Sequence, residues 1–377
     1  MNGWKYVTIG DVCTVERGGS PRPIDKFITD DPNGINWIKI GDTSDSMYIT
    51  STEQKIIPDG MKKSRYVRPG DFLLSNSMSF GRPYILKIDG CIHDGWLVLR
   101  DNNNIFNKRF LYYYLSAPST YRKFENMAVG GVVNNLNSEM VRGVTVPVPR
   151  MDEQLEIVSI LDAVGNLISL RKQQLSKLDE LVKARFVELF GTHNSPKCDV
   201  AKLSSIAKYQ QGTQVDMDKQ FDSNEGGRVR FLRIIDYTQG NQEPRYVENK
   251  GTYITSDVVC IVRYGTVGFV CKGYEGILAN NLFKIDLQTD RMTNDFLYCA
   301  LKYGSFEDDI KRLANGATMA ALSFKIMDRI DVVFPELGIQ SDFLTFVEQT
   351  DKSKFEIQKS LEKLETLKKA LMQKYFG

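Results

Sequence analysis

QLSKLDELVKARFVELFG, at residues 174–191, returns at residues 360–377 as SLEKLETLKKALMQKYFG, and this pair of segments decides the fold of the chain. Aligned without a gap at an offset of 186 positions, the two 18-residue segments share eight identities. Both end in Phe-Gly, and glycine can adopt the left-handed conformation that closes a helix. The sequence therefore predicts a duplicated chain in which each half ends with the same kind of helix.

Apolar residues recur three and four positions apart in both copies, which places them along one face of a long helix. The near-heptad period favours a coiled coil of two helices. A single stripe of this kind would also suit an ordinary core helix, but two copies at a fixed offset favour a duplicated architecture. The stripe residues are Leu161, Ile168, Leu175, Leu178, Val182 and Leu189 in the first helix, and Ile357, Leu361, Leu364, Leu371 and Tyr375 in the second.

The repeat extends well outside the helices. NWIKIGD (36–42) matches RFLRIID (230–236) at an offset of 194, and GCIHDGWLVL (90–99) matches GILANNLFKI (276–285) at an offset of 186. Repeats of this size indicate duplicated domains rather than a solenoid. The chain is therefore one unit written twice.

Each repeat begins with short aliphatic and aromatic segments between Gly, Pro, Asn and Asp clusters, which predict strands. A helical segment follows at 107–127 in the first repeat, broken near Ala117-Pro118, and a short strand precedes each long helix. We expect an α+β chain in which two mostly-β globular domains are joined by two long antiparallel α-helices. The expected parts are a domain at 1–150, a helix at 151–191, a second domain at 192–336 and a second helix at 337–377.

Short connectors limit how these parts can lie. A helix of about 40 residues is about 60 Å long, whereas a domain of about 140 residues is some 35 to 40 Å across. The second helix must then start near the end of the first and run back antiparallel to it. We expect the two domains at opposite ends of this rod, related by an internal pseudo-two-fold axis.

The composition describes a globular protein and leaves its partner open. Of 377 residues, 42% are hydrophobic and 25% are charged, and the net charge is only +2. This charge argues weakly against a surface coated in phosphate-binding residues, but a local basic face or a basic partner subunit would suffice. No apolar run approaches the roughly 18 residues that cross a bilayer, and the N-terminal segment lacks the pattern of a signal peptide. We expect a cytoplasmic protein.

The sequence lacks the common motifs of catalytic, nucleotide-binding and metal-binding sites. There is no G-x-G-x-x-G, no Walker loop and no Asn/Asp-Pro-Pro-Tyr stretch. His93 and His193, the only histidines, have no cysteine or carboxylate cluster nearby, and we expect His93 to be packed or hydrogen-bonded. Glu53-Gln54-Lys55 could be half of a nuclease site, but no upstream aspartate on a strand accompanies it, so a solvated loop is expected. Six scattered cysteines predict reduced thiols. The sequence predicts no catalytic residue, no metal and no cofactor in this chain.

At this point the sequence resembles the DNA-specificity (S) subunits of type I restriction–modification systems, over essentially the full chain. The resemblance is carried by the order domain, helix, domain, helix and by three segments: VPVPRMDEQLEIVSIL (146–161), KLDELVKARFVELFG (177–191) and VRYGTVG (262–268). The second copy departs from this pattern at FPELGIQSDF (334–343), where Gln340 is kept but the acidic residue before it is not.

The resemblance implies a non-catalytic subunit of a methyltransferase and endonuclease complex. Its two target-recognition domains would read an asymmetric bipartite sequence in double-stranded DNA. Its helices would set the spacing and bind two methyltransferase (modification) subunits, with restriction subunits added outside. S-adenosylmethionine, ATP and Mg²⁺ would then belong to the partner subunits, and the modification subunit would flip and methylate the target adenine. Two alternatives stay open: a tandem-domain protein-interaction scaffold, and the detached specificity half of a combined restriction–methylation enzyme.

Candidate DNA contacts lie on loops that are rich in Arg, Lys, Asn, Gln and Ser, because these side chains read base edges or bind phosphates. Each of them could instead be a solvated surface residue, and the glycines of VRYGTVG could simply form a tight turn. We favour Arg82 and Arg263 because their loops correspond in the two repeats. The candidates are Arg22, Lys62, Lys63, Arg65, Ser75, Asn76, Ser77, Arg82, Asn134 and Asn135 in the first domain, and Gln214, Lys219, Arg233, Arg263, Tyr264 and Thr266 in the second.

Four large apolar residues near the helix ends are the candidate contacts with the modification subunits. They are Phe186, Phe190, Met372 and Phe376. The alternative is that they cap the ends of the coiled coil.

Overall fold

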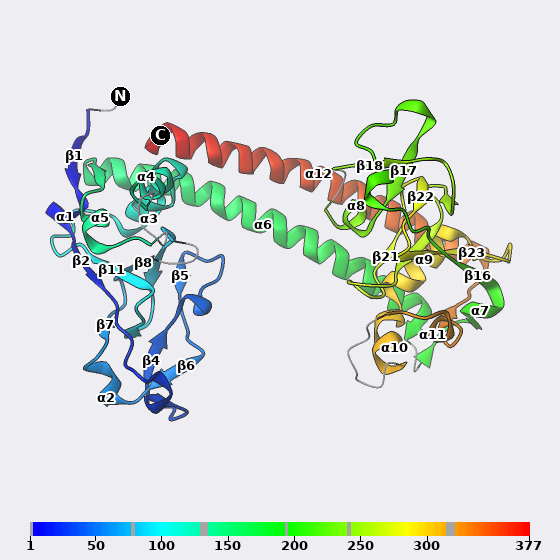
Figure 1. Ribbon diagram of the computed structural model, residues 1–377, viewed down its shortest axis with the longest axis horizontal. Coiled ribbons are helices and arrows are strands. Elements are labelled where there is room, and N and C mark those ends of the chain that lie inside the picture. The colour runs from blue at the N-terminus through cyan, green and yellow to red at the C-terminus, as the bar shows by residue number, and fades with distance from the viewer. Residues whose placement is uncertain (1–2, 77–79, 129–134, 193–194, 240–242, 314–320) are drawn as a thin grey trace. The chain divides into compact units, whose positions relative to one another are not determined.

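The computed structural model describes residues 3–76, 80–128, 135–192, 195–239, 243–313 and 321–377 (Figure 1). The chain divides into two compact units, one made of residues 1–171 with 360–377 and the other of residues 172–359. The long helices α6 (Met151–Phe190) and α12 (Leu337–Phe376) are therefore each shared between the two units. We describe each unit by itself.

Two five-stranded sheets form the β part of the first unit. The first has the order β2 (Thr14–Arg17), β11 (Trp96–Arg100), β8 (Phe72–Ser75), β9 (Pro83–Leu86) and β5 (Tyr48–Ile49). The second has the order β3 (Ile28–Thr29), β6 (Gln54–Ile56), β4 (Ile35–Ile38), β10 (Gly90–Ile92) and β7 (Arg65–Val67). A separate pair joins β1 (Lys5–Thr8) to β12 (Thr145–Val148), just before α6.

Alternating side chains of the first sheet enter two different cores, as the period of a strand requires. On β8, Leu73 packs between the two sheets with Ile38 and Trp96. Its neighbours Phe72 and Leu74 instead belong to the core that contains the helices α3 (Lys108–Ser116) and α4 (Pro118–Ala128). The predicted break of the 107–127 helix is confirmed, because α4 begins at Pro118.

The second unit repeats this topology. One sheet has the order β16 (Ala207–Gln211), β23 (Leu282–Leu287), β20 (Val259–Val262) and β21 (Val270–Cys271), and the other β18 (Arg245–Val247), β17 (Val229–Leu232), β22 (Gly276–Leu278) and β19 (Tyr253–Ile254). The pair β15 (Val200–Lys202) and β24 (Asp331–Val333) corresponds to β1 and β12. The helices α9 (Asn294–Tyr303) and α10 (Phe306–Leu313) correspond to α3 and α4. This correspondence confirms the predicted duplication.

The one parallel pair in the second sheet of each unit depends on glycine. β10 pairs with β4, and β22 with β17, in parallel. A Cβ on Gly90 would lie 2.5 Å from the Asn36 carbonyl oxygen, and a Cβ on Gly276 would lie 2.2 Å from that of Arg230. Only glycine permits this approach of two backbones.

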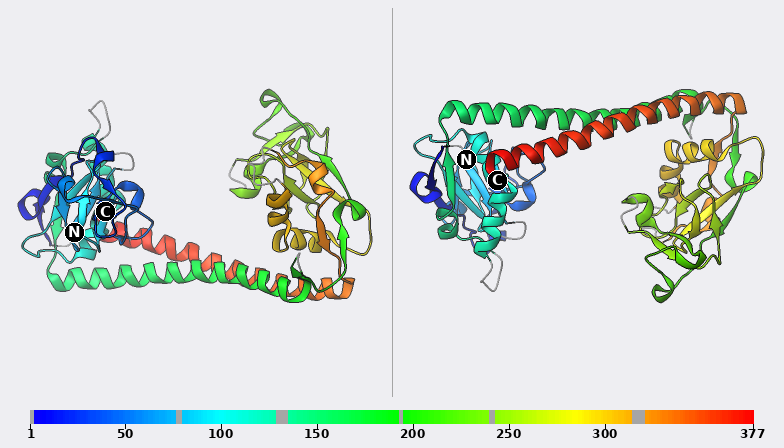
Figure 2. Two further views of the ribbon diagram at one scale, coloured as in Figure 1. Left: turned by 90° about the horizontal axis from the view of Figure 1, so that it is seen from below. Right: turned by 90° about the horizontal axis from the view of Figure 1, so that it is seen from above.

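The long helices run antiparallel within each unit, as predicted. In the first unit, Leu161 near the start of α6 shares a core with Phe376 at the end of α12. In the second, the ring of Phe186 near the end of α6 lies 5.5 Å from that of Phe343 near the start of α12, where the two helices lie side by side (Figure 2). Every residue of the two predicted apolar stripes is buried or half-buried.

A buried glutamine fixes the start of each long helix. Gln154 accepts a hydrogen bond from the Asn107 backbone N–H at 2.7 Å and donates to the carbonyls of Ile105 and Pro149, each at 3.0 Å. Gln340 makes the same three contacts, with Thr293 at 3.3 Å, Arg291 at 2.7 Å and Pro335 at 2.8 Å. Asn107 and Thr293 are the N-cap residues of α3 and α9.

This glutamine contact explains the departure of the second repeat near residue 340. The side chain of the acidic neighbour in the first repeat, Glu153, makes exposed contacts with Arg150, accepting from its backbone N–H at 3.0 Å and pairing with its side chain at 3.6 Å. The glutamine is kept because its side chain is buried, so that water cannot replace the backbone groups that satisfy its amide.

One local prediction needs correction. Glu53-Gln54-Lys55 leads into strand β6 rather than forming a solvated loop, because Gln54 and Lys55 pair with Trp37 and Asn36 of β4. A turn at residues 93–95 separates β10 from β11. Arg233 lies just after β17, at the N-cap of α8 (Ile234–Thr238).

Candidate nucleic-acid interface

A polar cluster lies where β2 and β8 of the first unit end. Its centre is Asp94, in the turn between β10 and β11. The Asp94 carbonyl oxygen accepts from Arg17 Nε at 3.1 Å and from Asn76 Nδ2 at 2.9 Å. The Asp94 carboxylate accepts from Ser20 Oγ at 2.7 Å and pairs with Arg22 at 3.4 Å. We call these five residues the first polar cluster.

A corresponding cluster lies where β16 and β20 of the second unit end. Asn280 takes the place of Asp94, and its carbonyl oxygen accepts from Gln211 Nε2 at 2.9 Å. The side-chain oxygen of Gln211, Oε1, accepts from Arg263 Nη1 at 2.7 Å. Gln214 accepts from Asn280 Nδ2, as Ser20 contacts Asp94 in the first unit. We call Gln211, Gln214, Arg263 and Asn280 the second polar cluster.

The backbone frame around the two clusters is the same. The N–H of Asn76 donates to Gly95 at 3.0 Å and its carbonyl accepts from Leu136 at 3.0 Å. The N–H of Arg263 donates to Asn281 at 2.8 Å and its carbonyl accepts from Leu322 at 3.0 Å. Asn76 and Arg263 are therefore equivalent positions on one frame that carry different side chains.

Glycine brings the first segment of each cluster against this frame. A Cβ on Gly18 would lie 2.1 Å from the His93 carbonyl oxygen, and one on Gly212 would lie 2.1 Å from that of Ala279. No side chain fits at such a distance, so only glycine allows Arg17 or Gln211 to reach the turn.

The two clusters differ in charge. The hydrogen bond from Ser20 lowers the pKa of Asp94, so this carboxyl is an anion that can hold Arg22. Burial lowers the pKa of the neighbouring His93, whose Nδ1 accepts from the Gly95 N–H at 2.6 Å and must be unprotonated to do so. The second cluster has the neutral amide of Asn280 where the first has the Asp94 carboxylate.

Three buried polar atoms at these positions have no hydrogen-bond partner among the described residues: Asn76 Oδ1, Arg263 Nε and Asn281 Oδ1. Native proteins leave few such atoms, because each costs about 1–3 kcal/mol.

Several predicted site residues come together at the clusters. Arg22 and Asn76 belong to the first, and Gln214 and Arg263 to the second. Tyr264 and Thr266 are exposed on the loop that begins at Arg263, and Asn135 is exposed beside Leu136. By their backbone hydrogen bonds, Asn76 corresponds to Arg263 and Arg82 corresponds to Phe269, so the counterpart of Arg263 is Asn76 rather than Arg82. Ser77 and Asn134 lie outside the described residues.

Other predicted residues lie elsewhere or serve the fold. Buried Ser75 supports its loop by accepting from the Arg82 N–H at 3.0 Å. Arg233 binds Asp236 at 3.3 Å and the Glu243 carbonyl at 2.6 Å. The remaining residues lie outside both clusters, and each has a partner in its own unit: Lys62 with Asp59, Lys63 with the Phe27 ring, Arg65 with Glu16, and Lys219 with Asp216.

Sequence reasoning missed Arg17, Ser20, Asp94, Gln211 and Asn280. A signal for some of them was present. The alignment of GCIHDGWLVL with GILANNLFKI sets Asp94 against Asn280, and the offset of 194 sets Ser20 against Gln214.

Burial corrects the predicted docking role of the four apolar residues at the helix ends. Phe186, Phe190, Met372 and Phe376 are at most 7% exposed. In the second unit, the first two pack against Phe343, and in the first unit the ring of Phe376 lies 5.5 Å from that of Phe110. Side chains buried in their own unit are not available to another subunit, which supports the capping alternative.

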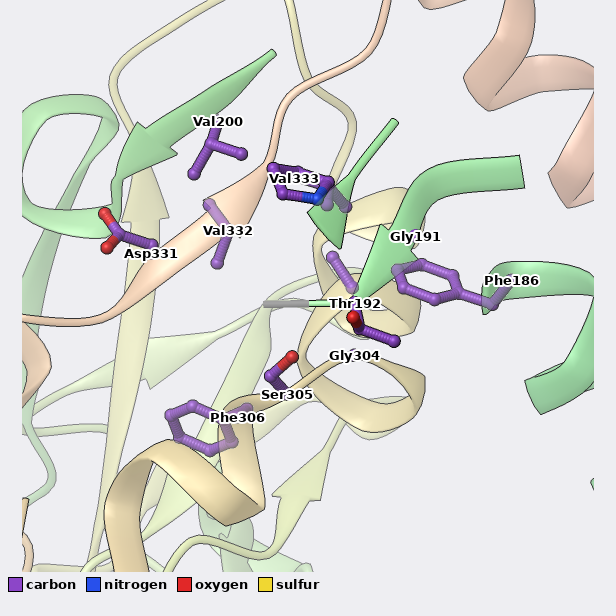
Figure 3. A pocket seen from close by; sticks show the side chains of 12 residues that line it. Phe186, Gly191, Thr192, Val200, Gly304, Ser305, Phe306, Asp331, Val332 and Val333 are labelled. Carbon is purple, nitrogen blue, oxygen red and sulfur yellow. The ribbon is translucent and has the colours of Figure 1, made fainter. Parts of the chain in front are cut away.

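A cavity of about 210 Å³ in the second unit is not part of the polar cluster (Figure 3). It lies between Phe186 at the end of α6, the short strand β13 (Gly191–Thr192), β24 and the turn at Gly304 and Ser305. Its walls are mostly apolar, and its one carboxylate, Asp331, pairs with Lys202 at 2.8 Å. Among the described residues that line the cavity, the one ionisable side chain is therefore already in an ion pair.

Metal-binding and membrane features can be assessed only over the described ranges. Within them, no three His, Cys, Asp or Glu residues are grouped so that they could hold a metal ion. No helix of the described chain combines the length and the apolar character needed to span a bilayer. All six cysteines are free thiols.

Comparisons with known proteins agree with this architecture. The type I restriction modification DNA specificity domain matches residues 1–180 and 197–369. The chain is 20% identical to the type I restriction enzyme MjaVIII specificity subunit of Methanocaldococcus jannaschii, over 98% of this chain and 91% of that protein. It is 22% identical to the putative MjaX specificity subunit of the same organism, over 98% and 92%.

Two solved structures are similar over the whole chain. One comes from a study of assembly and conformational transition of the type I restriction–modification system, with a TM-score of 0.64, 17% identity, and coverage of 100% of this chain and 98% of that one. The other is the S subunit of a type I system from M. genitalium, with a TM-score of 0.53, 14% identity, and coverage of 100% and 97%. At such identities these likenesses show the fold alone. The family match over most of the sequence shows more: the chain belongs to the non-catalytic DNA-specificity (S) subunits of type I restriction–modification systems.

Proposed function

We propose that the chain reads an asymmetric bipartite target in double-stranded DNA, one half with each polar cluster. The observation that carries this proposal is the shared backbone frame, which presents Asn76 in one unit and Arg263 in the other. A constant frame with different side chains suits two readers of different sequences. Family membership supports DNA as the ligand.

Arg263 is the best-placed base reader of the second cluster. Gln211 holds one of its nitrogens, and the guanidinium lies 5.0 Å from the centre of the Tyr264 ring, which helps to fix its plane. Its remaining N–H groups can donate to the O6 and N7 atoms of a guanine, the commonest specific contact in the major groove. The first cluster instead offers the Arg22–Asp94 pair, so the two half-sites should differ.

Exposed apolar residues that recur in both long helices are our proposed docking surface for two modification subunits. Leu181 and Leu367 occupy equivalent positions and are 49% and 46% exposed. Met151 and Leu337 are also equivalent, and are 42% and 48% exposed. Single exposed apolar residues are common, but repetition at matched positions favours a partner that covers both copies. S-adenosylmethionine, ATP and Mg²⁺ would be held by the partner subunits.

The DNA proposal is tested with the Arg263→Ala variant. Methylation-sensitive sequencing of the host genome, with and without this gene, gives the target motif. Affinity for a duplex with that motif is then measured in the presence of the modification subunits. We expect a loss of about 1–3 kcal/mol for Arg263→Ala, with weaker discrimination at one base pair.

Lys208→Ala is the matched control, because Lys208 is exposed on β16 and its side chain faces away from that of Gln211. Unchanged affinity of Arg263→Ala would remove this residue from the site. If the wild-type complex bound no sequence selectively, the DNA-reading function itself would fail and the scaffold alternative would be favoured.

Docking is tested separately with Leu181→Ser and Leu367→Ser. Co-purification with the modification subunits should weaken for each variant, whereas Gln173→Ser, at an exposed position of α6, should leave it unchanged. Full retention of the complex by both leucine variants would exclude these positions as contacts.

A further inference from the structure

A pocket of about 490 Å³ lies in the first unit, next to the loop that leaves the first polar cluster. Its walls come from Gly81 and Arg82, the start of β9, and the helices α3 and α4. The charged and aromatic residues that line it are Asp45, Arg82, Tyr84, Tyr112, Tyr121 and Arg122.

The two arginines of this pocket are not used by the fold as ion pairs. The Arg82 guanidinium lies 5.9 Å from the centre of the Tyr84 ring, and Arg122 Nε donates to the Pro118 carbonyl of its own helix at 3.3 Å. Over the described part of the chain, neither arginine makes an ion pair, and the exposed Asp45 at the same pocket makes none with them. Two cations therefore face one carboxylate in a hollow that solvent can reach.

Aromatic packing holds the pocket in shape. The rings of Phe80 and Tyr121 are stacked, with centroids 5.6 Å apart and planes 14° apart, which fixes α4 to the end of the loop. Burial raises the pKa of Tyr112, so its hydroxyl stays protonated and can donate a hydrogen bond.

The corresponding place in the second unit has the opposite charge. Phe269 occupies the position that Arg82 has in the first unit. The Phe269 carbonyl accepts from the Val262 N–H at 2.9 Å, as the Arg82 carbonyl accepts from the Ser75 N–H at 3.1 Å. At the offset of 186, Tyr121 and Arg122 become Glu307 and Asp308 of α10. The pocket is therefore a property of the first unit and not of the shared frame.

We propose that the Arg82–Arg122 pocket binds a phosphate group of the DNA backbone beside the half-site read by the first unit. This inference rests on the proposed DNA-reading function. The Arg82 N–H donates to Ser75 Oγ at 3.0 Å, directly beside Asn76 of the first polar cluster, so both regions would meet the same stretch of duplex. Arginine and tyrosine donors commonly bind phosphate oxygens, and such contacts position the protein without reading sequence.

The test measures how affinity for the cognate duplex depends on salt, with the modification subunits present. Each neutralised phosphate contributes about 0.9 to the slope of log K against log salt concentration. This slope is negative, and we expect the double variant Arg82→Gln/Arg122→Gln to make it less negative by about 0.9. Its loss of affinity should then be about 3.5-fold greater at 50 mM than at 200 mM salt. Discrimination between the cognate site and a mutated site should stay unchanged.

Two control variants distinguish an effect of the two arginine charges from an effect on folding or on overall charge. The double variant Arg82→Lys/Arg122→Lys keeps both charges and should keep the wild-type slope. Lys26→Gln removes an exposed charge on the 3₁₀ turn Ile24–Lys26 of the same unit and should also keep it. An equal change in slope for Lys26→Gln would overturn the assignment, because the effect would then reflect overall charge.

Other outcomes overturn the inference without touching the proposed function. A wild-type slope for the double glutamine variant would show that the pocket holds no phosphate. Altered base discrimination would make it a reading site, and loss of the modification subunits with normal DNA binding would make it a protein contact. Absence of sequence-selective binding by the wild-type complex would instead overturn the proposed function.

Discussion

Replacement of Gln154 by leucine tests whether one buried side chain fixes each long helix to its β domain. Leucine fills much of the same space but removes the hydrogen bonds to Asn107, Ile105 and Pro149. Gln154 is 1% exposed, so water cannot replace these partners unless the structure opens locally. Gln340→Leu makes the same change in the second unit.

The expected loss follows from these three contacts. Each hydrogen bond contributes about 1 kcal/mol net, and a buried group left without a partner costs about 1–3 kcal/mol. Loss of three contacts therefore costs about 3–6 kcal/mol, and burial of the leucine side chain offsets about 1–2 kcal/mol of it. We expect the free energy of unfolding of the first unit to fall by about 3 kcal/mol. Gln340→Leu should lose about as much, because its longer contact with Thr293, at 3.3 Å, is balanced by shorter contacts with Arg291 and Pro335, at 2.7 and 2.8 Å.

Urea unfolding gives the change in free energy, and hydrogen exchange with peptide resolution assigns it to a unit. In Gln154→Leu, the peptide that contains Asn107 should exchange faster, whereas the peptide that contains Thr293 should keep its wild-type rate. Gln173→Leu is the matched control, because Gln173 is exposed on the same helix, and its effect should stay within about 0.5 kcal/mol. If Gln154→Leu unfolded like this control and the peptide that contains Asn107 stayed protected, the glutamine would not hold the helix.

Three further predictions concern the polar clusters and the helix ends. Gly18→Ala should destabilise the first unit by about 1–3 kcal/mol and weaken DNA binding, because its Cβ would lie 2.1 Å from the His93 carbonyl oxygen, whereas Gly41→Ala has free space and should be neutral in both assays. Since burial lowers the pKa of His93 below 6.5, the unfolded chain binds its proton more readily, so stability should fall as pH drops from 6.5 towards the folded-state pKa. The urea midpoint should therefore be lower at about pH 5.5 than at about pH 7.5, and His93→Asn should reduce this difference. An undiminished difference would contradict the assignment to His93. Phe186→Ala should cost the second unit about 3–5 kcal/mol in calorimetry, and a loss below about 1 kcal/mol would refute its role in the core.

Much of the fold could be predicted from the sequence because the information is local and repeated. The two apolar stripes define the faces of α6 and α12 by their spacing, and the offset of 186 places the start of each helix. The strands of both units follow from short apolar segments between turn residues. Gln340 was visible as a kept residue, although the reason for it was not, because two of its three partners lie 47 and 49 positions away along the chain.

The sites depended on the tertiary structure. Asp94 joins Arg17 across 77 positions of sequence, and this contact exists only because β11 pairs with both β2 and β8. Phe186 and Met372 could not be assigned from their spacing, because an apolar stripe does not tell whether its own domain or another subunit covers it. Hydrophobic period and internal repetition thus determined the elements and their duplication, since both are written along the chain. Which polar side chains meet, and which apolar ones are already buried, was decided by strand pairing and packing between distant segments.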